Sequence, residues 1–286
     1  MAAQTEITNM ALFCDFENVA LGVRDAKYAS FDIKKVLERL LLKGSIVVKK
    51  AYCDWDRYKE FKAIMHEAAF ELIEIPHVRQ SGKNSADIRM VVDALDLCYT
   101  KAHVDTFVII SGDSDFSPLV SKLRENNKHV IGIGVKDSTS DLLSANCDEF
   151  IFYDDLVREQ EAKQHAKQQR AAKKPSAKAA AGKAKASPAK GEDAQQPDAR
   201  LEARQEALDF IVETVEALIA ERGSDEKIWG SMVKTTMQRR RPGFTESSYG
   251  YRSFKELVED AQKHKLLVVV RDEKSGQYTI RLTAAE

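Results

Sequence analysis

Four aspartates stand at the ends of short apolar segments or at the start of a helix, and they are the residues of this chain best suited to chemistry. Residues 107–110 have the composition of a buried strand, and Asp113 and Asp115 follow them at once. Asp15 follows an earlier apolar run in the same way, and Asp87 comes where a helix begins after a polar loop. Because the carboxyl ends of parallel strands meet at one edge of a sheet, we expect these carboxylates to share one pocket. Crowded carboxylates select a hard cation such as Mg²⁺ or Mn²⁺, which favours metal-dependent phosphodiester hydrolysis.

The same acids have a structural explanation, since Asp113 or Asp115 can cap the helix that Pro118 begins. Zinc is disfavoured because the cysteines and histidines are scattered and form no CxxC pair. Ser111 and Ser114 suggest a serine nucleophile, but no histidine sits at a matching strand end, so we set that chemistry aside.

Three further polar residues accompany the acids. Asn18 could orient a ligand or a water by hydrogen bonding, and Lys83 lies on the loop before Asp87, where an ammonium could meet a phosphate. Both are equally compatible with ordinary surface positions. Asp93 is a weaker ligand candidate, because six residues separate it from Asp87, roughly 9 Å along a helix axis.

Apolar strands and amphipathic helices alternate across residues 1–158. The expected strands are 11–14, 45–53, 71–75, 107–110, 130–135 and 150–153, and the expected helices are 31–42, 58–70, 86–99, 118–127 and 141–147. This alternation predicts an α/β domain with a parallel sheet and helices on both faces.

The composition of the chain bears on its number of domains, its cellular compartment and its relation to membranes. The chain has 286 residues, room for one or two domains, with 44 basic and 45 acidic side chains. The cysteines, all within the first 147 residues and in apolar segments, predict buried thiols in a reducing compartment. There is no apolar run long enough to span a membrane, and residues 1–10 lack the features of a signal peptide. We therefore expect a cytoplasmic protein that does not enter the membrane.

Residues 159–200 lack apolar periodicity, and from 162 to 190 they contain basic residues and no acids. This composition predicts a disordered basic linker, although its alanine-rich start could extend a helix. The segment is either a plain tether or an arm that binds phosphates through counterion release.

Regular structure is expected again over residues 201–286. The expected helices are 207–220, 227–238 and 254–261, and the expected strands are 266–270 and 277–282, joined by a turn at 272–276. Three helices followed by a hairpin predict a winged-helix arrangement. Cations and aromatic rings gather before and within the third helix, as single-stranded nucleic acid recognition requires, and the candidates are Arg239, Arg240, Arg241, Tyr249, Tyr251, Arg252 and Lys255. Phe244 and Phe254 are expected in the core.

Three motifs resemble the NYN domain, a branch of the PIN-like nucleases that includes the LabA-like bacterial proteins. They are CDFENV at 14–19, KNSADIRMVVDAL at 83–95 and ISGDSDFSPLVSKLRENNKHVIGIG at 110–134. The resemblance implies a Rossmann-like, PIN-type α/β/α sandwich whose acids hold Mg²⁺ or Mn²⁺ for RNA cleavage. It implies Asp15, Asp87, Asp113 and Asp115 as metal-site carboxylates with Asn18 beside them. It also makes Asp93, which matches an acidic position of the family, a stronger ligand candidate than its distance from Asp87 suggests. Ala86 is a departure, because many relatives have valine there.

A second resemblance lies in the C-terminal half. PGFTESSYGYRSFKELVEDA at 242–261, followed by LLVVVRDEKSGQYTIRL at 266–282, is similar to the LOTUS domain, also called OST-HTH. That family consists of small winged-helix modules associated with RNA binding, so the resemblance implies an RNA-binding domain at 201–286.

Together these features predict a Mg²⁺- or Mn²⁺-dependent endoribonuclease whose winged-helix domain and basic linker hold the RNA. The alternative is a noncatalytic RNA-binding regulatory protein whose acidic pocket has lost turnover, and the presence of all the acids favours the enzyme. DNA stays open as a substrate because nothing in the sequence reads a 2′-hydroxyl. A homodimer through the winged-helix surface is also compatible with the sequence.

Overall fold

The computed structural model describes residues 8–75, 85–172, 196–223, 226–271 and 277–283. The chain divides into two compact units, Met1–Pro175 and Ser176–Glu286. Each unit has its own hydrophobic core and is described separately below.

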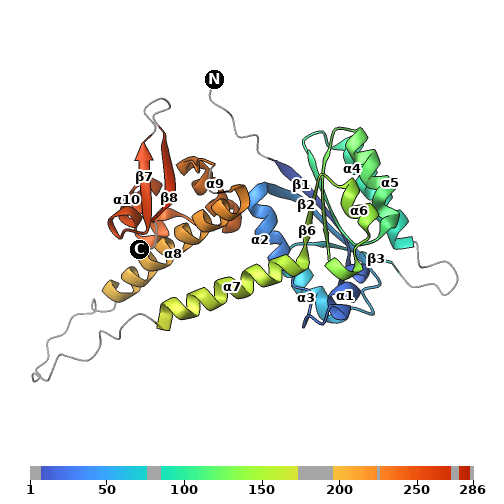
Figure 1. Ribbon diagram of the computed structural model, residues 1–286, viewed down its shortest axis with the longest axis horizontal. Helices are drawn as coiled ribbons and strands as arrows, with labels where there is room; N and C mark the ends of the chain where they lie inside the picture. Colours follow the sequence, from blue (N-terminus) through green and yellow to red (C-terminus); the bar gives the residue numbers. More distant parts are fainter. Residues whose placement is uncertain (1–7, 76–84, 173–195, 224–225, 272–276, 284–286) are drawn as a thin grey trace, which may run out of the picture. The chain divides into compact units, whose positions relative to one another are not determined.

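The first unit is built on a parallel sheet of six strands in the order β3-β2-β1-β4-β5-β6 (Figure 1). The strands are β1 (Asn9–Asp15), β2 (Ser45–Cys53), β3 (Glu71–Glu74), β4 (Thr106–Ile110), β5 (His129–Gly134) and β6 (Glu149–Phe152). The chain runs outward from β1 to β3, then returns to the other side of β1 and runs outward again from β4 to β6. The order therefore reverses between β1 and β4, the position where ligands bind in open α/β sheets.

Helices cover both faces of this sheet, and the side chains of β1 alternate between them. Met10, Leu12 and Cys14 pack into the core beneath α1, α2, α3 and α7, whereas Ala11 and Phe13 pack into the core beneath α4, α5 and α6 (Figure 1). The helices are α1 (Phe16–Asp25), α2 (Ile33–Lys43), α3 (Lys59–Glu67), α4 (Ser85–Thr100), α5 (Ser117–Glu125), α6 (Asp141–Asn146) and α7 (Tyr153–Ala172), with short 3₁₀ turns η2 (Ser114–Phe116) and η3 (Lys136–Ser138). The predicted α/β/α sandwich is confirmed.

Two helices depart from the sequence prediction. Helix α1 was not expected; Asp15 caps its first turn, and its buried Phe16, Val19 and Val23 face the core. Helix α7 continues to Ala172, well into the segment predicted to be disordered from residue 159, so the alternative that the alanine-rich start of this segment extends a helix is confirmed. Its alanine, glutamine and lysine residues favour helix without needing an apolar face. The rest of the predicted linker up to residue 195 lies outside the described residues.

The second unit contains α8 (Gln196–Arg222), α9 (Gly230–Arg240), the 3₁₀ turn η4 (Glu246–Tyr249), α10 (Phe254–Lys263) and an antiparallel hairpin of β7 (Leu267–Arg271) and β8 (Tyr278–Leu282). Its core joins Ile211, Val215 and Leu218 of α8 to Leu257 of α10 and Ile280 of β8. Three helices followed by a hairpin is the predicted winged-helix order. The predicted turn at 272–276 lies outside the described residues.

Two smaller expectations can be compared with the structure. Cys14, Cys53 and Cys98 are buried free thiols and Cys147 is partly buried. Within the described ranges, none of the helices has both the length and the apolar character needed to cross a membrane.

Candidate functional site at the strand order reversal

Asp15 ends β1 at the point where the strand order reverses. It is 8% exposed, and it caps α1 by accepting a hydrogen bond from the backbone N–H of Asn18 at 3.4 Å. Its other carboxylate oxygen accepts a hydrogen bond from the hydroxyl of Ser111 at 3.1 Å. Burial, and next the nearby charge of Asp87, raise the pKa of the Asp15 carboxyl to about 7. Asp15 is therefore held in place by neutral donors while its charged form is disfavoured.

The loop after β4 is folded around its own hydrogen bonds. The hydroxyl of Ser111 accepts a hydrogen bond from the backbone N–H of Asp113 at 3.2 Å. Asp113 in turn caps the turn η2, because its Oδ1 accepts a hydrogen bond from the backbone N–H of Asp115 at 3.0 Å. The capping explanation considered for Asp113 is thus realised, and it engages one of the two carboxylate oxygens. A single hydroxyl, that of Ser111, links the loop to Asp15.

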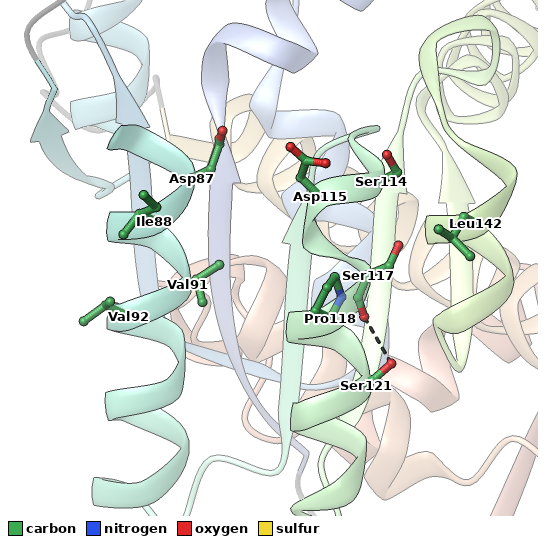
Figure 2. Close-up of a pocket in the computed structure, with 10 residues that line it drawn as sticks. All are labelled: Asp87, Ile88, Val91, Val92, Ser114, Asp115, Ser117, Pro118, Ser121 and Leu142. Atoms are coloured by element: carbon green, nitrogen blue, oxygen red, sulfur yellow. Dashed lines mark hydrogen bonds between the residues drawn. The ribbon is translucent and has the colours of Figure 1, made fainter. Parts of the chain in front are cut away.

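Asp87 supplies the third segment, in the first turn of α4. Burial, and then the charges of Asp113, Asp115 and Glu17, raise the pKa of the Asp87 carboxyl to about 6. Figure 2 shows Asp87 and Asp115 at the same end of their neighbouring helices. Carboxylates from β1, from α4 and from the loop after β4 therefore lie close enough to influence one another's ionisation.

The donor set of this acidic site suits a hard divalent cation. Asp15, Asp87 and Asp113 offer only carboxylate oxygens, and their mutual repulsion is what a bound cation relieves. No three His, Cys, Asp or Glu side chains in the described ranges stand in a ready-made metal-binding arrangement. The carboxylates that the sequence predicts as ligands thus gather at one sheet edge, but they would have to draw together around an ion.

Three of the predicted site residues have different surroundings. The side chain of Asn18 is already engaged, because its oxygen accepts a hydrogen bond from the backbone N–H of Gly112 at 2.9 Å. Asp93 lies lower on α4 and accepts hydrogen bonds from Tyr52 at 2.9 Å and Arg89 at 3.0 Å. Lys83 lies outside the described residues.

Two residues near the acids were not predicted to act there. Ser111 had been considered only as a nucleophile, and its role is to hold Asp15. Glu17 contributes to the raised pKa of Asp87 and forms an ion pair with Arg57 at 3.4 Å. Its position in the sequence could have indicated this role, since Glu17 stands two residues after Asp15 at the end of the same strand.

In the second unit, part of the predicted RNA-binding set is used internally. Tyr251 is 1% exposed and its hydroxyl donates to Asp260 at 2.8 Å, so its ring has no free face for a base and we withdraw it from the set. Arg240 forms an ion pair with Glu213 at 2.7 Å, and Arg241 forms one with Glu206 at 2.8 Å.

The remaining candidates of this set differ in exposure. Arg252 and Lys255 are exposed, although Lys255 lies 3.7 Å from Glu259. Tyr249 is partly exposed and stacks on Phe244, with 5.0 Å between ring centroids. Arg239 is partly buried, and burial lowers the pKa of its guanidinium. The arginine run is therefore largely neutralised, and Arg252 and Lys255 are the more accessible cations.

The fold and the acidic site define the class of protein. A six-stranded parallel sheet between helical layers, with acids at the order reversal, is a PIN-like α/β/α domain. The NYN domain model matches residues 9–154, more than half of the chain, so the chain belongs to the NYN domain family. Members of this superfamily are typically nucleases, which indicates a nuclease- or RNA-related function.

Individual relatives are distant. An uncharacterized protein of Methanocaldococcus jannaschii is 30% identical over 125 residues, which is 44% of this chain and 49% of that protein. The meiosis regulator and mRNA stability factor 1 of Xenopus tropicalis is 25% identical over 156 residues, 54% of this chain and 9% of that protein. The chain thus spans half or less of the length of these relatives. A crystal structure of a Vibrio parahaemolyticus protein of unknown function is 28% identical, covering 53% of this chain and 96% of that one with a TM-score of 0.47.

Proposed function

We propose that the protein is a Mg²⁺- or Mn²⁺-dependent endoribonuclease that hydrolyses RNA phosphodiesters at the acidic site. The observation that carries the proposal is the electrostatic coupling of three distant segments. Burial is the largest cause of the raised pKa of Asp15 and of Asp87; the charge of Asp87 further raises the pKa of Asp15, and the charge of Asp113 further raises the pKa of both. Such crowding of carboxylates destabilises a fold through charge repulsion, and a bound divalent cation would relieve that repulsion.

Asp15, Asp87, Asp113 and Asp115 would hold the cation. When bound, it supplies a Lewis acid that polarises a phosphodiester and makes water a better nucleophile near neutral pH. The chain's own residues position the acids for this task. Ser111 orients Asp15, and the backbone N–H of Asp115 orients Asp113. Asn18 fixes the separation of the two loops through Gly112.

RNA is the favoured substrate over DNA for two reasons. The NYN domain is an RNA-related domain. The name of the Xenopus relative also links that protein to mRNA stability. Both reasons come from similarity, so a DNA substrate belongs in the first assay.

We propose that the second unit is a LOTUS-type module that holds RNA for the NYN domain. In this arrangement, residues 1–158 form the nuclease domain, 159–200 a basic linker and 201–286 the RNA-binding domain. The support is the winged-helix order of elements together with the exposed cations Arg252 and Lys255. The free thiols favour a reducing compartment such as the cytoplasm, and a homodimer through this module stays a prediction.

The test is cleavage of labelled single-stranded RNA by the full chain with Mn²⁺, with the matching DNA alongside. EDTA and the Asp87→Asn substitution should each abolish product formation. Asp96→Asn is the matched control, because Asp96 lies on the same helix α4 and is exposed. It should cut at the wild-type rate.

The outcomes separate the two functional classes. Cleavage that needs Mn²⁺ and Asp87 supports the nuclease. Tight RNA binding without products, in Mn²⁺ and in Mg²⁺, would overturn it in favour of the noncatalytic RNA-binding protein. Equal cutting by Asp87→Asn and the wild type would mean that the activity resides elsewhere.

A further inference from the structure

A cavity opens directly beside the acidic site. It has a volume of about 720 Å³ and lies between α4 on one side and η2, α5 and α6 on the other (Figure 2). Asp87 and Asp115 line both the cavity and the acidic site. Whatever is bound at these two carboxylates therefore has this cavity as its immediate neighbour.

The walls of the cavity are apolar and face solvent. Ile88 of α4 is 63% exposed and Leu142 of α6 is 59% exposed, and Val91 and Pro118 add further apolar surface between them. Large apolar side chains gathered around one cavity at this exposure are typical of a binding surface. Since Asp87 and Asp115 are the only charged residues among the described lining, the cavity has no cation to attract a phosphate.

Hydroxyl groups on the same lining differ in accessibility. Ser117 is 6% exposed, and its Oγ is shielded from the cavity and has no hydrogen-bond partner among the described residues. The hydroxyl of Ser121 donates to the backbone oxygen of Ser117 at 3.2 Å, the dashed line in Figure 2. Ser114 is partly exposed on this lining, so its hydroxyl is one that a ligand in the cavity can reach.

We propose that this cavity binds a nucleobase, that of the nucleotide next to the phosphodiester held at the acidic site. The inference rests on the proposed function. A base is uncharged and flat, so its face can pack against the apolar lining on the side of Ile88 or on the side of Leu142 without a nearby cation. Its polar edge can exchange a hydrogen bond with the hydroxyl of Ser114. A base that packs here has left its stack, so we expect this nucleotide to be unpaired.

The experiment is photo-crosslinking of the full chain to a single-stranded oligouridine that carries 4-thiouridine, with Ca²⁺ present to neutralise the carboxylates. Cross-linked peptides are mapped by mass spectrometry. We expect cross-links within Ser85–Thr100 and Asp141–Asn146, the helices that carry Ile88 and Leu142. Cross-links confined to other segments would overturn the proposal.

Variants give a quantitative second arm. Ile88→Ala combined with Leu142→Ala should lower the yield of these cross-links roughly tenfold, because two apolar contacts are lost. Both residues are exposed and alanine favours helix, so the fold should persist. Tyr99→Ala is the matched control, since Tyr99 is an exposed apolar residue on the same helix α4 and should leave the yield unchanged.

Ser114→Ala tests the hydroxyl alone. It should lower the cross-link yield several-fold, because the hydrogen bond to the edge of the base is lost. An unchanged yield in both Ser114→Ala and the double variant would contradict the proposal, as would a double variant that changed only the oligomeric state. Cross-linking does not require cleavage, so a chain that binds here without cutting would refute the nuclease and not the cavity.

Discussion

The side-chain oxygen of Asn18 accepts a hydrogen bond from the backbone N–H of Gly112 at 2.9 Å, across 94 positions of the chain. This bond ties the loop after β1 to the loop after β4, and so it sets the spacing between Asp15 and Asp113. The other side of the loop after β4 is also closely packed. A side-chain carbon at Gly112 would lie 2.5 Å from the backbone oxygen of Ser138.

Replacing Asn18 by alanine should loosen this tie. The backbone N–H of Gly112 would lose its partner in a partly buried place, and the free energy of unfolding should fall by about 1–3 kcal/mol. Urea denaturation, followed by the fluorescence of the first unit, would measure the loss in the free energy of unfolding. An unchanged midpoint would mean that the loops hold their spacing without this bond.

The raised pKa of Asp15 makes the stability of the cation-free protein depend on pH. The carboxyl has a pKa of about 7 in the folded chain against an ordinary value of 3.8. The folded state therefore keeps its proton to higher pH than the unfolded state, and stability is lost as pH rises from about 4 through 7. Asp15→Asn removes this dependence, so its melting temperature should match the wild type at pH 4 and exceed it at pH 8. The gain in free energy is about 4 kcal/mol at most.

The control for this titration is Asp96→Asn, an exposed carboxyl on α4. It removes one exposed carboxylate outside the acidic site. A difference between Asp15→Asn and the wild type that did not change with pH would show that Asp15 ionises normally in the folded protein.

Cation binding should release protons. Near pH 7 the Asp15 carboxyl is about half protonated, and a cation requires its ionised form, so roughly half a proton should leave for each Mn²⁺ bound. Calorimetric titration in buffers of different ionisation enthalpy measures this number. The release should vanish at pH 8.5, and in Asp15→Asn at pH 7 it should fall to about a tenth of a proton, the share expected from Asp87 with its pKa of about 6. Proton release that stayed constant across this range would assign it to another group.

In the second unit, buried and exposed cations should behave in opposite ways. The Arg240 side chain is 11% exposed and donates to Glu213 and to the hydroxyl of Thr214 at 3.0 Å. Arg240→Ala should lower the stability of this unit by about 1–3 kcal/mol while changing RNA affinity little.

The converse holds for the exposed pair. Arg252→Ala combined with Lys255→Ala should leave stability unchanged, weaken RNA binding, and reduce the slope of log affinity against log salt by about 2. Filter binding at several salt concentrations measures both quantities. If only Arg240→Ala weakened binding, the RNA would be using the arginine run.

Much of the fold follows from local sequence patterns, and the exceptions have physical reasons. The strand 45–53 agrees with β2 residue for residue, because its apolar and β-branched residues, interrupted only by Lys49 and Lys50, are bounded by Gly44 and Asp54. Helix α1 escaped notice because Gly22 interrupts its pattern. That glycine serves packing, since a side-chain carbon there would lie 2.4 Å from the hydroxyl of Ser138.

The candidate sites show a similar division. Asp15, Asp87 and Asp113 could be grouped from sequence because parallel strands deliver their carboxyl ends to one edge. The pairing of Arg240 and Arg241 could not, since their partners Glu213 and Glu206 lie 27 and 35 positions away on another helix. The sequence of the arginine run does not reveal which acidic residues, distant in the chain, the fold places beside it.

The central place of β1 has a consequence for synthesis of the protein. β1 is hydrogen-bonded to β2 on one side and to β4 on the other, so during synthesis it cannot complete its pairing until residues 106–110 have emerged from the ribosome. Until then Asp15 lacks both Ser111 and the loop that carries Asp113. During synthesis the acidic site is therefore incomplete until the loop that carries Asp113 has emerged, and the nuclease activity proposed above cannot begin before then.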